Sequence, residues 1–285
     1  YPKRIFQKLD DIGYRLDVKA KLAAEDPDAF FVDLFEVFEK RIEAINYFFD
    51  SEEWQIFVGM ITATDRLHHY FFPQVLENGP YHQVILEFYR KLDAFVGDIF
   101  QRSKDRGALL LTCSDHGFVS IKTEVYINRW LIENGYLELE EGKNGLIGIT
   151  GNSRAFCLDP ARIYIHSQGK YPRGPVKESE YAVLRDELAE QLSRLTHNGD
   201  KVVKKIFYRE DIFTGPYSDR GPDIYLLPHN GFDLKGALNR RDLFGKTHFC
   251  GMHTYDDAHL FIFPAQRIDN PRIEQIAPLI ENYFI

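Results

Sequence analysis

The chain has 285 residues, of which 44% are hydrophobic, so it is long enough for one large domain or a domain with a lid. Its formal net charge of −8 argues against a nucleic-acid-binding surface, because phosphate backbones recruit Lys and Arg. No apolar run approaches the roughly 20 residues that span a membrane, and three widely spaced cysteines argue against a disulfide framework or a Cys-based zinc finger.

The first half of the chain alternates predicted helices and strands. Residues 26–50 predict a helix, with Asp26 as N-cap, Pro27 at the first helical position and apolar residues at three- and four-residue spacing. The run WQIFVGMITA, residues 54–63, predicts a buried strand. A second helix is expected over 81–106, and another buried strand over 108–113. Strands joined by long helical crossovers are typical of a parallel sheet covered by helices.

The second half begins with a region of different character. Residues 125–215 contain short strand-like pieces and one clear helix at 177–196. Two further buried strands are predicted at the ranges 222–228 and 258–264, and a closing helix follows them. We therefore expect an α/β fold over residues 1–285, a three-layer α/β/α sandwich around a mostly parallel sheet. Residues 125–215 are expected to form an inserted cap or edge region.

Three clusters of acidic and imidazole side chains lie beside predicted strands. The clusters are TDRLHHYF with Asp65, His68 and His69; SDHG with Asp115 and His116; and GMHTYDDAH with His253, Asp256, Asp257 and His259. Ligands of open parallel sheets bind at the carboxyl ends of the strands, where the first two clusters are expected. The third lies in a predicted loop before a strand, and must fold back to reach the same edge.

The residue types in these clusters suit a metal ion. Carboxylate oxygen and imidazole nitrogen together favour Zn²⁺, Mn²⁺ or Fe over Ca²⁺. Asp65 and His69 are four residues apart, so one helical turn places both on the same face. Asp115 and His116 can both turn inward after a strand, and Gly117 permits a backbone conformation that a side chain would forbid. Each motif alone is more often a surface helix pair, an ordinary turn or a loop, so the hypothesis depends on all three occurring together.

The motifs TDRLHHYFFP, SDHGF and GMHTYDDAHLFIF, in this order, resemble the alkaline phosphatase superfamily, and within it the type I phosphodiesterase and nucleotide pyrophosphatase branch. The resemblance implies two divalent metal ions, with zinc favoured over manganese. It implies that one ion is held by Asp65, His69 and His253. It implies that Asp115 and His116 hold part of the other. His68 and His259 do not fall on the motif positions, and we expect them to have packing or structural roles.

The resemblance also implies an earlier segment that carries a further metal-binding Asp and a Thr or Ser nucleophile. Only 64 residues precede Asp65, and Asp10, Asp11 and Asp17 follow no predicted buried strand. We therefore expect the chain to lack the front portion of a longer protein, with the nucleophile upstream of residue 1. On this hypothesis the chain binds metal without turning over a phosphate ester, and no catalytic or substrate-binding residue is assigned within it.

The activity that the resemblance implies is hydrolysis of a phosphate ester. A hydroxyl nucleophile attacks phosphorus in line, while two ions stabilise the attacking and leaving oxygens. The expected partner is a small phosphorylated substrate, either a monoester or a diester. Alternatives within the superfamily are a phosphomutase, a sulfatase or a phosphonate hydrolase. A non-catalytic binding module is the alternative outside enzymes, and metal content distinguishes it.

Overall fold

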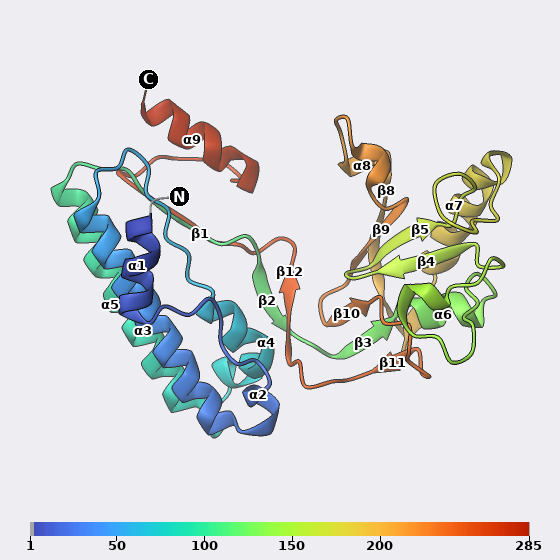
Figure 1. The fold of residues 1–285 in the computed structure, drawn as a ribbon, viewed down its shortest axis with the longest axis horizontal. Helices are drawn as coiled ribbons and strands as arrows, with labels where there is room; N and C mark the ends of the chain where they lie inside the picture. Colours follow the sequence, from blue (N-terminus) through green and yellow to red (C-terminus); the bar gives the residue numbers. More distant parts are fainter. Residues whose placement is uncertain (1–2, 285) are drawn as a thin grey trace. The chain divides into compact units, whose positions relative to one another are not determined.

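The computed structural model describes residues 3–284, and these divide into two compact units (Figure 1). Unit 1 combines the residues up to Ser120 with those from His248 onward, and unit 2 is Ile121–Thr247. Each unit contains both helices and strands, so the mixed α/β class is confirmed. Residues 125–215 lie within unit 2, and their role as an inserted cap remains a prediction.

Unit 1 is built mainly from helices. Its elements are α1 (Lys3–Ile12), α2 (Leu22–Glu25), α3 (Pro27–Ser51), α4 (Ala63–Leu76), α5 (His82–Asp105), β1 (Leu110–Cys113), β2 (Gly117–Ser120), β12 (Gly251–Thr254), β13 (Leu260–Phe263), η3 (Ile273–Gln275) and α9 (Ile276–Tyr283). The start of α3 is as predicted, because the Asp26 side chain accepts a hydrogen bond from the Ala29 N–H at 3.1 Å. Phe38 of α3 packs on Phe88 of α5, and both are fully buried.

The strands of unit 1 form two antiparallel pairs. β1 pairs with β13, and these two strands correspond to the ones predicted at 108–113 and 258–264. β1 is only half-buried, and its last residue, Cys113, is exposed. β2 pairs with β12, which places His253 opposite Phe118 and Thr254 opposite Gly117. The chain on either side of this second pair carries the candidate metal-binding motifs and the boundary with unit 2.

The strand predicted over residues 54–63 is wrong. The residues between α3 and α4 form neither helix nor strand, and residues 54–61 make no backbone–backbone hydrogen bond within the described chain. Their side chains are partly covered: Phe57 packs on Phe49 and Trp54, whereas Val58 and Met60 are 82% and 65% exposed. The run is therefore apolar as its composition shows, but no neighbouring strand pairs with it.

Unit 2 contains most of the strands. Its elements are β3 (Thr123–Tyr126), α6 (Ile127–Glu133), η1 (Gly145–Gly148), β4 (Ala155–Leu158), β5 (Arg162–Ile165), α7 (Glu178–Ser193), β6 (Thr196–His197), β7 (Asp200–Lys201), β8 (Val203–Tyr208), α8 (Arg209–Ile212), η2 (Ser218–Arg220), β9 (Ile224–Pro228), β10 (Phe232–Lys235) and β11 (Phe244–Gly245). The largest sheet has the order β4-β5-β9-β8, and its core includes Ile163, Leu188 and Leu226. The helix predicted at 177–196 and the strand predicted at 222–228 are confirmed as α7 and β9.

A buried carboxylate links the start of β9 to its surroundings. Asp223, which is 1% exposed, precedes β9 and accepts hydrogen bonds from the Tyr181 hydroxyl at 2.6 Å and from Arg209 at 2.7 Å. Its other oxygen accepts from the Ile165 N–H at 2.7 Å. One carboxylate therefore joins a helix, a strand and the start of α8.

The mostly parallel sheet expected from the sequence is not confirmed. Residues 3–284 contain five small sheets, and β3–β10 is the parallel pair while the other strand pairs are antiparallel. The physical reason lies in unit 1, where the apolar run at 54–61 and the open edges of β1 and β13 have no parallel neighbours. The expected three-layer sandwich therefore has no central sheet in the described residues.

Candidate metal centre

Helix α4 carries the first two candidate ligands. Asp65 and His69 lie one turn apart, and Asp65 Oδ1 is 3.5 Å from His69 Nε2, as the four-residue spacing predicts. The segment before them differs from the prediction, because an irregular segment and not a strand leads into α4. The predicted position at a strand end is therefore wrong for this cluster, although the predicted pairing is right.

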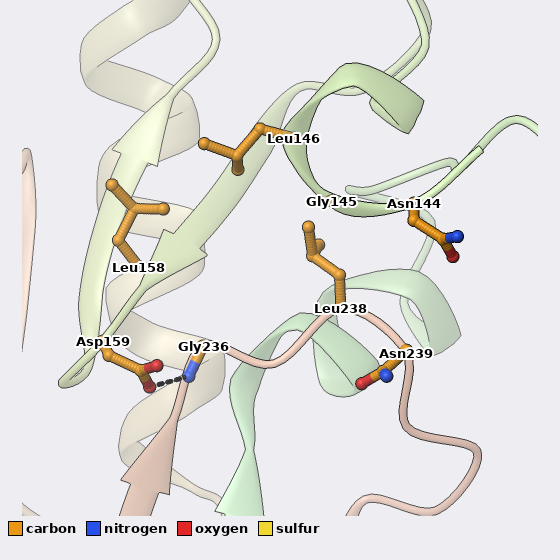
Figure 2. A pocket seen from close by; sticks show the side chains of 8 residues that line it. All are labelled: Asn144, Gly145, Leu146, Leu158, Asp159, Gly236, Leu238 and Asn239. Atoms are coloured by element: carbon orange, nitrogen blue, oxygen red, sulfur yellow. Dashed lines mark hydrogen bonds between the residues drawn. The ribbon is translucent and has the colours of Figure 1, made fainter.

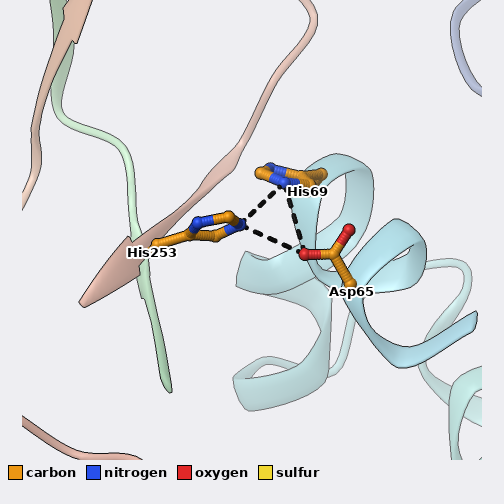
Figure 3. Close-up of side chains that lie close together, drawn as sticks. All are labelled: Asp65, His69 and His253. Atoms are coloured by element: carbon orange, nitrogen blue, oxygen red, sulfur yellow. Dashed lines mark hydrogen bonds and ion pairs between the residues drawn. The ribbon is translucent and has the colours of Figure 1, made fainter. Parts of the chain in front are cut away.

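Strand β12 brings the third candidate ligand to the same point. His253 Nε2 lies 3.1 Å from both Asp65 Oδ1 and His69 Nε2, and Figure 3 shows the three side chains converging from the helix and the strand. The sequence predicted a loop at His253, and this prediction is wrong because His253 lies in β12. The ladder between β12 and β2 holds it, so no folding back of a loop is needed.

A proline in α4 explains how β12 is attached to the helix. Pro73 has no N–H, so the carbonyl of His69, four residues earlier, loses its helical partner, and the helix is kinked at Phe71. The Cys250 N–H donates to this free carbonyl at 2.7 Å. A Cβ at Gly251 would overlap with the His68 carbonyl, so only glycine permits this close approach.

The same attachment fixes the imidazole of His69. Its Nδ1–H donates to the Gly251 carbonyl at 3.0 Å, which leaves the lone pair on Nε2, the atom that faces Asp65 and His253. Burial lowers the pKa of His69, and the neighbouring Asp65 carboxylate offsets this only in part. The ring is therefore held in the neutral form that binds metal.

Arg66 fixes the orientation of Asp65. Its guanidinium bonds Asp65 Oδ2 and is itself held by Asp17 at 2.7 Å, so Oδ1 is the oxygen left for the three imidazoles. Burial raises the pKa of Asp65, but the hydrogen bond with His253 and the charge of Arg66 outweigh it, and the pKa lies below its ordinary value. The carboxylate is therefore ionised at neutral pH.

The spacing of these atoms fits a zinc ion. The three ligand atoms lie within 4.8 Å of one another. Tetrahedral zinc with bonds of 2.0–2.1 Å needs ligand atoms about 3.3 Å apart, and the observed separations are 3.1, 3.1 and 3.5 Å. The donor set and its geometry therefore suit a divalent ion.

The second predicted pair lies beside this group. Asp115 and His116 connect β1 to β2, with His116 Nε2 3.5 Å from Asp115 Oδ1 and 3.9 Å from Asp65 Oδ1. The Asp115 side chain is 79% exposed, whereas that of His116 is 19% exposed. The reason given for Gly117 is wrong, because its φ is not positive. It is needed for space, since a Cβ there would overlap with the Asp257 carboxylate.

Phe118 is a residue that the sequence analysis missed. Its ring centroid lies 5.1 Å from that of His69, 5.3 Å from His116 and 5.0 Å from His253. One apolar ring thus packs against all three imidazoles of the centre and limits their rotation. The motif SDHGF contains this residue, but nothing in the sequence shows that the β2–β12 pairing directs it under the histidines.

The remaining histidines of the motifs lie outside the centre, as expected. His68 bonds the Tyr89 hydroxyl, and burial lowers its pKa to about 4. His259 lies beside Thr112 at 3.4 Å. Tyr70, the residue after His69, is half-buried and stacks on His248 and Phe249. These contacts are structural.

A pocket of unit 2 has no part in this centre. Figure 2 shows its lining, in which Asn144, Asn239 and Asp159 are the polar side chains, and the Asp159 carboxylate already accepts the Gly236 N–H. None of the candidate metal ligands lines it. Among the helices of residues 3–284, none combines the length and apolar character that a membrane span requires.

The family of the chain follows from comparison with known proteins. The family model described as type I phosphodiesterase / nucleotide pyrophosphatase matches residues 4–256, and the chain belongs to this family. The match includes all five candidate ligands and confirms the resemblance stated from the motifs. Searches among curated proteins and among solved structures gave no match.

Proposed function

We propose that this chain belongs to a hydrolase that cleaves phosphodiester or pyrophosphate bonds in a small phosphorylated substrate, using two divalent metal ions, zinc before manganese. Family membership supports hydrolysis of phosphoric esters. The observation that carries the metal dependence is the convergence of Asp65, His69 and His253 from a helix and a distant strand. A chance surface cluster would not need the backbone attachment that links α4 to β12.

The residues have distinct roles in this proposal. Asp65, His69 and His253 hold one ion, and Asp115 and His116 hold part of the other. Bound ions supply positive charge at the phosphoryl oxygens and activate a hydroxyl nucleophile, which is not assigned to any residue here. The protein itself orients the ligands, through Arg66 on Asp65 and the Gly251 carbonyl on His69.

The charge of the protein also supports metal dependence. The net charge is −8, and the centre holds the carboxylates of Asp65 and Asp115. A phosphate group approaching these side chains is repelled unless cations are bound there. Phosphate binding by this centre should therefore require metal.

The test is metal content followed by phosphate binding. We expect the purified chain to retain about one or two equivalents of zinc by elemental analysis, since its family's centre fits such ions. The zinc-loaded chain should bind inorganic phosphate in calorimetry, and the chelator-treated chain should not. The double variant Asp65→Ala, His253→Ala should lose both the metal and the phosphate binding.

A matched control uses residues of the same types outside the centre. His259→Ala and Asp98→Ala remove an imidazole and a carboxylate that face other residues, and both should retain the metal. A chain that takes up no zinc or manganese, or that binds phosphate equally without metal, contradicts the proposed function.

A further inference from the structure

His116 lies between the two acidic side chains of the candidate centre. Its Nε2 is 3.5 Å from Asp115 Oδ1 and 3.9 Å from Asp65 Oδ1. Its Nδ1–H donates to the Gly117 carbonyl at 3.1 Å, and a carbonyl only accepts, so Nε2 carries the lone pair. His116 therefore presents one metal-binding atom to two carboxylates.

The group around Asp65 lacks one ligand of a four-coordinate ion. Asp65, His69 and His253 supply three ligand atoms, and closed zinc sites have four. The His116 ring is stacked on that of His253, with centroids 3.4 Å apart and planes 18° from parallel. His68, the other nearby imidazole, is already bonded to Tyr89. His116 Nε2, 3.9 Å from Asp65 Oδ1, is a further imidazole nitrogen that can complete the set once its ring turns away from that of His253.

The group around Asp115 is poorer in ligands. Within residues 3–284, Asp115 and His116 belong to no group of three metal-binding side chains. The Asp115 side chain is largely exposed, and it lies against His116. An ion should therefore bind more tightly at the three preorganised ligands around Asp65 than at Asp115, because each further ligand binds at high effective concentration.

We propose that His116 is shared between two ions: it is the fourth ligand of the ion at Asp65 when one ion is bound, and it moves to Asp115 when a second ion arrives. This inference rests on the proposed function, because it takes the centre to be a metal site. It differs from a fixed assignment of His116 to the second ion. Ion binding is then ordered, with the Asp65 group filled first.

The sharing has a functional consequence. With one ion bound, four side chains enclose it and no position is open for a phosphate oxygen, as in a structural site. The second ion draws His116 away and opens that position, as a catalytic site requires. Phosphate binding should therefore begin only with the second equivalent of metal.

The test is a cobalt titration of the metal-free chain, followed by visible absorption. Four-coordinate cobalt absorbs visible light more strongly than cobalt with five or six ligands. We expect strong absorption during the first equivalent and a lower absorption per cobalt during the second. Inorganic phosphate should change the spectrum after the second equivalent and leave it unchanged after the first.

Variants of the two neighbouring residues separate the alternatives. His116→Ala and His116→Gln should weaken the first equivalent at least about tenfold, since even the loss of a partner that orients a ligand costs that much. Asp115→Asn should leave the affinity and spectrum of the first equivalent unchanged and remove the change at the second. Far-ultraviolet circular dichroism of each metal-free variant checks that it is folded.

Two results overturn the inference. One is that His116→Gln and His116→Ala bind the first equivalent of metal as tightly as the unsubstituted chain does. The other is an Asp115→Asn variant that loses the first equivalent as much as the His116 variants do. Both results leave the proposed function intact if Asp65→Ala still abolishes metal binding, whereas a chain that binds no cobalt or zinc contradicts the proposed function itself.

Discussion

Two short apolar runs of this chain lie in opposite surroundings. In unit 2, β9 lies between β5 and β8, and its residues Ile224 and Leu226 are fully buried. In unit 1, residues 54–61 have no backbone partner, and Val58 is 82% exposed. Apolar composition gives a run the tendency to be buried, but partner strands decide whether it is, because unpaired N–H and C=O groups must stay in water.

The two units are consequently stabilised in different ways. Unit 2 has a hydrogen-bonded sheet around a common core, with Asp223 as a buried link. The candidate metal centre of unit 1 depends on a few local attachments, chiefly the Cys250 N–H on the His69 carbonyl. Substitutions in unit 2 should therefore change its stability, whereas substitutions at the attachments should change metal affinity.

The largest effect is expected from Asp223→Ala. The variant leaves the Arg209 guanidinium, the Tyr181 hydroxyl and the Ile165 N–H without their acceptor, so the free energy of unfolding of unit 2 should fall by about 3 kcal/mol. Each unit has one tryptophan, so Trp130 fluorescence in a Trp54→Phe background reports urea unfolding of unit 2.

The control for this variant is Asp219→Ala. Asp219 is an exposed residue of η2, and its loss should change the unfolding free energy by less than about 0.5 kcal/mol. Equal midpoints of urea unfolding for Asp223→Ala and Asp219→Ala would show that the Asp223 carboxylate does not hold β9 in place.

The comparison also explains which parts of the fold could be predicted. The helix that begins at Asp26 was predicted correctly, because capping and periodicity are local properties. The strand at 54–63 and the parallel sheet were not, because pairing depends on residues far apart in sequence. Residues 224–228 and 54–61 have similar apolar character, and only their neighbours distinguish them.

The site shows the same division. The pairing of Asp65 with His69 followed from one helical turn, and is confirmed. The approach of His253 could be expected only by analogy, since it depends on the β2–β12 register and on the carbonyl that Pro73 frees. Phe118 could not be found, because its role comes from facing His253 across that ladder.

A smaller effect, on metal affinity, is expected from Pro73→Ala. Alanine restores an N–H that competes with Cys250 for the His69 carbonyl, so α4 straightens and β12 is held less firmly. His69 is then less well oriented, and zinc affinity in calorimetry should fall by about tenfold, the lower end of the effects seen when the groups that orient a metal ligand are changed. The helix content in circular dichroism should not fall.

The matched variant is Pro80→Ala, which changes a proline in the turn before α5 and touches none of these bonds. It should leave zinc affinity unchanged. If Pro73→Ala binds zinc as tightly as Pro80→Ala, the attachment of β12 through the His69 carbonyl does not position the ligand.

The smallest effect is expected from Val58→Ala. The side chain already lies in water, so its shortening removes almost no buried surface, and the unfolding free energy of unit 1 should change by less than about 0.5 kcal/mol. Trp54 fluorescence in a Trp130→Phe background measures this in urea. The same substitution at Val125, which is fully buried in β3 of unit 2, should cost about 2 kcal/mol because it leaves a cavity, and Trp130 fluorescence in the Trp54→Phe background measures it.

This pair of valines tests the comparison directly, because the residue type is the same and only the surroundings differ. If the two substitutions cost the same, the exposed face of residues 54–61 is covered in solution, and the run is buried as its composition suggests. If Val58→Ala is neutral and Val125→Ala is not, burial in this chain follows strand pairing. Exposed side chains of the run, such as Val58, then contribute nothing to the stability of unit 1. Its covered side chains, such as Phe57 against Phe49 of α3, account for where the run lies.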